Sequence, residues 1–121
     1  MTNTYSFETF WSWLLRHPNC ILRAGSLQAT LYDDTDFHWH FAAEGTLLYV
    51  QVIRGKRLCG ELVIDPEQIA YVQYVGEEAE GEQLFDCVVE TEDERLISHF
   101  FVLTHEFDDE ELIPSHERAV H

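Results

Sequence analysis

The chain has 121 residues, 45% of them hydrophobic, and carries 23 Asp and Glu against 7 Lys and Arg, a formal net charge of −16. This length and apolar content suit a single domain with one packed core. The charge argues against nucleic acid and anionic membranes as partners, because both attract positive charge. It favours cations or a basic protein partner.

The sequence also indicates a cytoplasmic protein. No run approaches the roughly 18 apolar residues of a membrane span, and the N-terminus lacks the basic region of a signal peptide. The three cysteines, Cys20, Cys59 and Cys87, are widely spaced and form no Cys-x-x-Cys pair. Neither a zinc ribbon nor a disulfide framework is therefore indicated. Each cysteine has apolar neighbours, which predicts a buried thiol.

The first predicted element is a helix over Ser6–His17. Its apolar residues recur at helical spacing and form one stripe. They are Phe7, Phe10, Trp11, Leu14 and Leu15. Ser6 suits the N-cap, Glu8 suits the first turn, and Pro18 ends the helix. Trp13 falls off the stripe, where we expect ordinary packing or a cover for a sheet edge or partner surface.

The rest of the chain reads as strands separated by turn signals at hairpin spacing. The expected strands are Leu27–Tyr32, Phe37–Ala43, Thr46–Arg54, Arg57–Ile64, Ile69–Val75, Gln83–Glu90 and Arg95–His105. Thr46–Arg54 is nearly continuously apolar and is the expected central strand. One helix and about six or seven strands predict an α+β fold, with the helix packed on a mostly antiparallel, twisted sheet. We expect one domain over residues 1–111 and a flexible tail over 112–121.

Acidic clusters recur where the strands should end. The candidate metal ligands are Asp33, Asp34 and Asp36 in the first cluster, Glu77, Glu78, Glu80 and Glu82 in the second, and Asp108, Asp109 and Glu110 in the third. Calcium takes six to eight oxygens from carboxylates, backbone carbonyls and water. The clusters therefore predict Ca²⁺ as the bound ion. The alternative for each cluster is a solvated acidic surface.

An EF-hand is not present. Twelve residues counted from Asp33 do end at Glu44, but the sixth position, which requires glycine, is His38. The predicted flanks are strands rather than helices. Any calcium site is therefore expected to be assembled from turns, with more than one segment contributing ligands.

Two histidines give a second candidate metal site. His38 and His40 are two residues apart in a predicted strand, so they share one face, and imidazole pairs suit transition metals. With Glu44 they resemble the first half of a cupin motif, which His99 or His105 would have to complete. Histidines on the less apolar face of a strand are more often surface residues. Because motifs for nucleophilic catalysis and phosphate binding are absent, we expect no enzyme.

The aromatic helix, the run Cys20–Gly25, the Asp-rich segment Tyr32–Phe41 and the strong acidity resemble CcbP, the small acidic calcium-binding protein family of filamentous cyanobacteria. The likeness covers Ser6 to Glu111. It implies a cytosolic protein that sequesters Ca²⁺ and takes part in the calcium signal of heterocyst differentiation. It assigns no ligand positions here. The alternative function is an interaction module whose acidic face docks a basic partner.

Overall fold

The computed structural model of the chain describes residues 4–104. This part is α+β, as predicted, with one α-helix packed on mostly antiparallel sheet. The strands are β1 (Thr4–Tyr5), β2 (Ile21–Ser26), β3 (Thr30–Tyr32), β4 (His38–Glu44), β5 (Leu47–Arg54), β6 (Arg57–Ile64), β7 (Tyr71–Ala79), β8 (Glu82–Glu90) and β9 (Arg95–Leu103). The helices are α1 (Phe7–Arg16) and the short 3₁₀ turns η1 (Pro18–Cys20) and η2 (Pro66–Gln68). No helix within the described residues has the length and hydropathy to cross a bilayer.

Helix α1 begins where the sequence predicts. Ser6 is its N-cap, and the Ser6 hydroxyl oxygen accepts a hydrogen bond from the Thr9 backbone N–H at 3.1 Å. The buried arc is rotated from the predicted stripe, because Trp13 is fully buried and Leu15 is 49% exposed. Trp13 therefore packs in the core, while its ring stacks on His17 with the centroids 4.1 Å apart.

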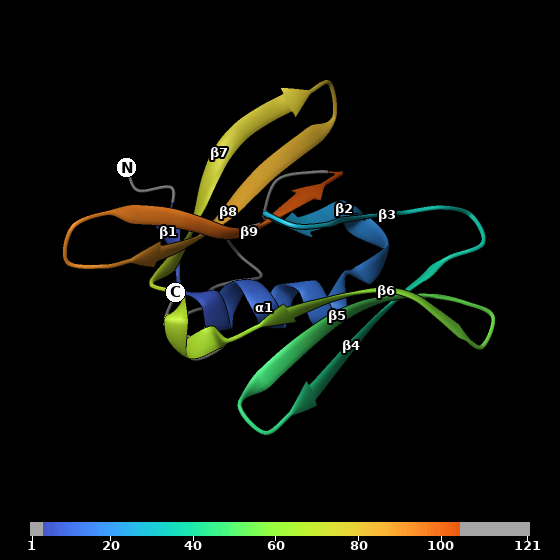
Figure 1. The fold of residues 1–121 in the computed structure, drawn as a ribbon. Coiled ribbons are helices and arrows are strands. Elements are labelled where there is room, and N and C mark those ends of the chain that lie inside the picture. Colours follow the sequence, from blue (N-terminus) through green and yellow to red (C-terminus); the bar gives the residue numbers. More distant parts are fainter. Residues whose placement is uncertain (1–3, 105–121) are drawn as a thin grey trace, which may run out of the picture.

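Six strands form the large sheet, in the order β1-β7-β8-β9-β2-β3 with antiparallel neighbours. The β7–β8 hairpin contains two register shifts, one on each side of Gly76, which has a φ of 136°. Extra residues of this kind bend a strand and increase its twist. Figure 1 shows the hairpin rising away from the rest of the sheet.

The remaining three strands form the small sheet, in the order β4-β5-β6. The predicted central strand is central here, because β5 pairs with both β4 and β6. Tight turns at Gly45 and Gly55, with φ of 63° and 64°, close the two hairpins. A side chain at either position would strain the backbone.

Helix α1 lies between the two sheets (Figure 1), so it buries apolar side chains toward both. Phe10 packs against Phe85 and Phe101 of the large sheet, with ring centroids 5.5 and 5.4 Å away. Trp11 meets Phe41 of the small sheet edge-on, with the centroids 5.4 Å apart. This double contact explains the rotated burial, because a helix between two layers needs an apolar arc wider than one stripe.

Three expectations need correction. The strands divide into two sheets, rather than one sheet of six or seven strands. Glu77 and Glu78 lie on β7, not in a loop, because the strand continues to Ala79. Of the three cysteines only Cys87 is buried, whereas Cys59 is exposed. The domain boundary at residue 111 and the tail over 112–121 lie outside the described residues.

Candidate functional site

Two of the predicted acidic clusters lie at the same end of the large sheet. Asp33 directly follows β3, and its backbone N–H donates to the Leu22 carbonyl on β2 at 2.9 Å. The next residue of β2, Arg23, is the register partner of Tyr32, which precedes Asp33. The Arg23 side chain in turn contacts the second cluster. The cluster that begins at Asp33 and the turn of the β7–β8 hairpin therefore lie at the same end of the sheet, with β9 and β2 between their strands.

Arg23 is the positive charge that contacts the second cluster. Its Nη2 lies 2.5 Å from Oε1 of Glu78 and 2.9 Å from Oε1 of Glu82. The pKa of Arg23 is raised, chiefly because Glu82 accepts its hydrogen bond and to a smaller extent because Glu78 does. One guanidinium thus faces two carboxylates, which leaves a net negative charge at this end of the sheet.

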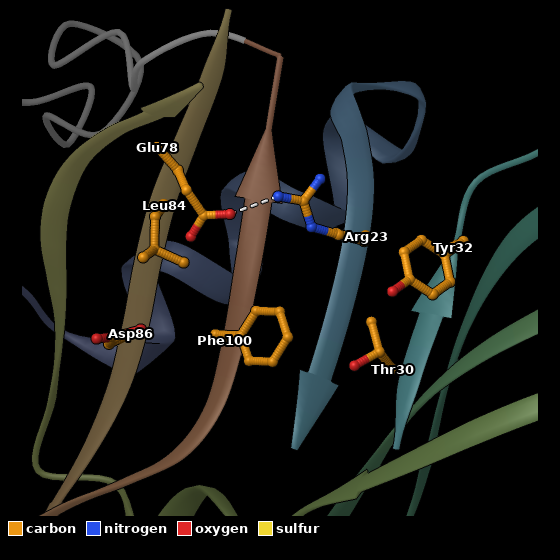
Figure 2. Close-up of a pocket in the computed structure, with 7 residues that line it drawn as sticks. All are labelled: Arg23, Thr30, Tyr32, Glu78, Leu84, Asp86 and Phe100. Atoms are coloured by element: carbon orange, nitrogen blue, oxygen red, sulfur yellow. Dashed lines mark hydrogen bonds and ion pairs between the residues drawn. The ribbon is translucent and has the colours of Figure 1, made fainter. Parts of the chain in front are cut away.

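A hollow of about 280 Å³ opens beside this ion pair on the face of the large sheet that points away from α1. Its lining residues are Arg23, Thr30, Tyr32, Glu78, Leu84, Asp86 and Phe100. Figure 2 shows the Glu78 carboxylate turned toward Arg23, and the Phe100 ring between β9 and β2. The ring lies over Gly25, because a Cβ there would be 2.6 Å from two of its carbons. The hollow combines two carboxylates, a guanidinium, two hydroxyls and two aromatic rings.

Asp86 carries a further negative charge on the wall of the hollow. Partial burial raises the pKa of Asp86, and the nearby Glu78 carboxylate raises it further. Both causes disfavour the ionised form, so a cation that entered the hollow would relieve an existing electrostatic cost. Among the carboxyl groups within residues 4–104, Asp86 is the one whose surroundings most clearly disfavour the ionised form.

The three aspartates of the first cluster are exposed, and their contacts are mostly local. Oδ1 of Asp34 accepts from the Thr35 hydroxyl at 3.2 Å and from the Asp36 backbone N–H at 3.4 Å. Asp36 lies 3.8 Å from Arg54 in an exposed ion pair. These bonds stabilise the turn, as aspartates commonly do. They leave most carboxylate oxygens in contact with solvent.

The second cluster is divided between two faces. Glu78 and Glu82 face Arg23, whereas Oε2 of Glu77 accepts from the Gly81 backbone N–H at 3.1 Å and from the Gln83 side chain at 3.3 Å. Glu80 is exposed in the turn. Glu77 therefore supports the hairpin, Glu78 lines the hollow, and Glu82 pairs with Arg23.

The structure does not contain a preformed metal site in its described part. Within residues 4–104, no group of three or more His, Cys, Asp or Glu side chains is arranged to hold an ion. The third predicted cluster, Asp108, Asp109 and Glu110, lies outside these residues. An ion bound here would therefore need side chains to move, with water as part of its coordination shell.

The histidine pair lies elsewhere, on the small sheet. His38 and His40 are exposed on one face of β4, as predicted. His99 does not join them, because its Nε2 lies 2.9 Å from the Val63 carbonyl oxygen and the ring is partly buried. His105, the other proposed partner, lies outside the described residues. A complete cupin-like ligand set is therefore not assembled among residues 4–104.

Sequence reasoning missed Arg23, Asp86 and Phe100. The available signals were a lone arginine and a lone aspartate inside otherwise apolar strands, since charged side chains in a strand must reach solvent or a partner. Comparisons with known proteins add nothing to this site, because no family model, no curated protein and no solved structure matches the chain. The resemblance to CcbP stays a prediction from the sequence.

Proposed function

We propose that this protein binds Ca²⁺ at the acidic end of the large sheet and acts as a cytoplasmic calcium buffer or sequestering protein. One observation supports this most strongly. The carboxylates of Glu78 and Glu82 meet at the guanidinium of Arg23, beside a hollow lined by Glu78 and Asp86, and the Asp33–Asp36 cluster follows β3 at the same end of the sheet. A doubly charged hard cation relieves the repulsion in such a group of carboxylates.

The proposed binding step is an exchange of cations. Glu78 or Glu82 would turn from Arg23 toward the entering ion, and the cation would offset the electrostatic cost of the ionised Asp86 carboxylate. Water and the exposed oxygens of the Asp33–Asp36 cluster would complete the shell. Because ligands must first leave Arg23, the affinity is expected to be modest, in the range of sensors or extracellular modules rather than the tightest buffers.

Calorimetric titration with Ca²⁺, and then with Mg²⁺, tests the proposal directly. Ca²⁺ should also raise the melting temperature beyond what NaCl of equal ionic strength does, because specific binding stabilises the folded state while screening is common to both salts. If NaCl reproduces the entire shift and calorimetry detects no binding, the proposal is wrong.

A matched pair of variants locates the site. The triple variant D33N/D34N/D36N removes three charges from the proposed end, and E90Q/E92Q/D93N removes three charges from the other end of β8. Only the first variant should reduce the rise in melting temperature that Ca²⁺ produces. If both variants reduce this rise equally, Ca²⁺ is attracted to the overall net charge and does not occupy a defined site.

A second function is favoured by the composition of the hollow. Carboxylates beside the rings of Tyr32 and Phe100 also suit the guanidinium or ammonium group of a basic protein partner, through ion pairing and cation–π contact. Such a complex would weaken with added salt and would not require Ca²⁺. Binding of an Arg-rich and a Lys-rich peptide, with and without Ca²⁺, separates the two functions.

A further inference from the structure

A chain of polar side chains crosses the outer face of the small sheet, one from each strand. His40 on β4 is the register partner of Gln51 on β5, and Gln51 is the partner of Glu61 on β6. Nδ1 of His40 lies 2.9 Å from Oε1 of Gln51, and Nε2 of Gln51 donates to Oε2 of Glu61 at 2.6 Å. The three side chains therefore form one continuous hydrogen-bonded row.

This row determines the tautomer of His40. An ionised Glu61 carboxylate can only accept hydrogen bonds, so it takes the amide NH₂ of Gln51. The amide oxygen of Gln51 must then face His40. Because that oxygen also only accepts, Nδ1 of His40 carries the proton, and Nε2 is left with its lone pair.

His38 lies beside His40 in the arrangement that a chelate needs. The two residues share one face of β4 and are exposed, with their Cα atoms about 7 Å apart along an extended strand. Ligand nitrogens about 2.0–2.1 Å from a tetrahedral ion lie a little over 3 Å from each other. Rotation of two exposed imidazoles about their χ angles can close that difference.

We propose that His38 and His40 chelate a borderline divalent transition-metal ion such as Zn²⁺, with Gln51 and Glu61 orienting His40 from behind. Metal-binding histidines characteristically donate their second N–H to such an acceptor, which fixes the ring and raises its basicity. Since no third His, Cys, Asp or Glu joins the pair within residues 4–104, water fills the remaining positions. This site differs from the proposed calcium site in sheet, ligand atoms and metal class.

Histidine ¹⁵N NMR on the full chain tests the ligands without any mutation. His40 should be the Nδ1–H tautomer in the metal-free protein. One equivalent of Zn²⁺ is added in saturating Ca²⁺, which occupies the carboxylates. It should change the ¹⁵N chemical shifts of Nε2 of His40 and of one ring nitrogen of His38. An Nε2–H tautomer at His40, or Zn²⁺ shifts confined to other histidines, would overturn the proposal.

Variants then test each part of the arrangement. H38Q and H40Q should each weaken Zn²⁺ binding at least tenfold in calorimetry, and the control H116Q/H121Q should not. E61Q should weaken it about tenfold, because the Gln51 amide is no longer held in one orientation. E67Q removes the same charge from the exposed η2 turn and serves as its control. If E61Q and E67Q bind Zn²⁺ with the same affinity, the proposal that Gln51 and Glu61 orient His40 is wrong.

Discussion

Arg23 on β2 and Glu78 on β7 form a 2.5 Å ion pair, although two strands, β8 and β9, separate their own strands in the large sheet. In a flat sheet this separation would be about 14 Å between backbones. The contact exists because register shifts around Gly76 bend the β7–β8 hairpin over the outer face. The bend borders the hollow and places Glu78 and Glu82 beside one guanidinium.

Replacing Arg23 should strengthen calcium binding. R23Q frees Glu78 and Glu82 from their ion pairs and removes one positive charge from the proposed site. We expect the Ca²⁺ affinity to rise about threefold to tenfold, which corresponds to about 0.7–1.4 kcal/mol. Calorimetric titration measures the change.

The control for this variant is R95Q. Arg95 lies 3.9 Å from Glu90 in the hairpin at the other end of β8, so its removal changes the net charge equally without affecting the site. If R23Q and R95Q raise the Ca²⁺ affinity by similar amounts, the increase comes from the change in overall charge. Weaker binding in R23Q would contradict the proposed exchange of cations.

Neutralising Asp86 should stabilise the protein at neutral pH. The folded-state pKa of Asp86 is raised by desolvation and by Glu78, so stability falls as the pH rises above the unfolded-state value, and the full cost is present above the folded-state pKa. D86N removes this cost, and because the side chain is partly exposed the gain is about 0.5–1 kcal/mol. Urea unfolding at pH 7 measures it.

The pH dependence supplies the control for D86N. Below the unfolded-state value of 3.8 both states bind the proton, so the advantage of D86N should shrink as the pH falls toward that value. E80Q, in the exposed turn of the same hairpin, should stabilise less. A gain for D86N that is independent of pH would show that the charge is not its cause.

The parts of the fold that were predictable depend on local pattern. Ser6 as a cap, the alternation in β4 and the glycine turns at Gly45 and Gly55 are encoded within a few residues. Strand pairing is not local. β2 pairs with β9 and β1 pairs with β7. The alternation of apolar and polar residues along a strand does not specify which other strand will pair with it. The division into two sheets therefore could not be inferred.

The candidate site was predictable only in part for the same reason. The acidic clusters are evident in the sequence, and two of them lie at the same end of the large sheet. Arg23 and Asp86 join them through the order of the strands and the bend at Gly76, neither of which a residue pattern encodes. Glu77 and Glu78 were expected in a loop because glycines bracket the cluster, yet the first glycine is a bend within β7.

His99 should make stability depend on pH. Its folded-state pKa is lowered, chiefly by burial, with the hydrogen bond to Val63 opposing the shift. A lowered pKa means that the unfolded chain binds the proton more readily, so stability is full above about 6.5 and is lost as the pH falls through the folded pKa. In H99Q, which keeps a donor for the Val63 carbonyl, the loss between pH 7 and pH 5 should be smaller. H38Q, at an exposed position, is the control in urea unfolding.

Alanine at two strand glycines, Gly25 and Gly60, should have unequal effects. A Cβ at Gly25 would lie 2.6 Å from two Phe100 ring carbons and 2.9 Å from the Ala29 backbone oxygen, whereas a Cβ at Gly60 would lie 2.5 Å from the terminal Cδ2 of Leu31. The Leu31 side chain can change rotamer, but the Ala29 backbone cannot yield without distorting the strand pair. We expect G25A to cost about 2–3 kcal/mol and G60A about 1 kcal/mol, or roughly 8–24 °C and 4–8 °C in melting temperature.

The comparison of G25A with F100L/G25A separates the two contacts at this position. If the Phe100 ring is the main obstacle, F100L/G25A should recover most of the stability that G25A loses. If the Ala29 carbonyl dominates, the double variant should be no more stable than G25A. We expect the second result, because an aromatic side chain on the open outer face can move into the hollow while the β2–β3 hairpin keeps its hydrogen bond from Ser26 to Ala29 at 2.8 Å. Equal melting temperatures for G25A and the unmodified chain would contradict both explanations.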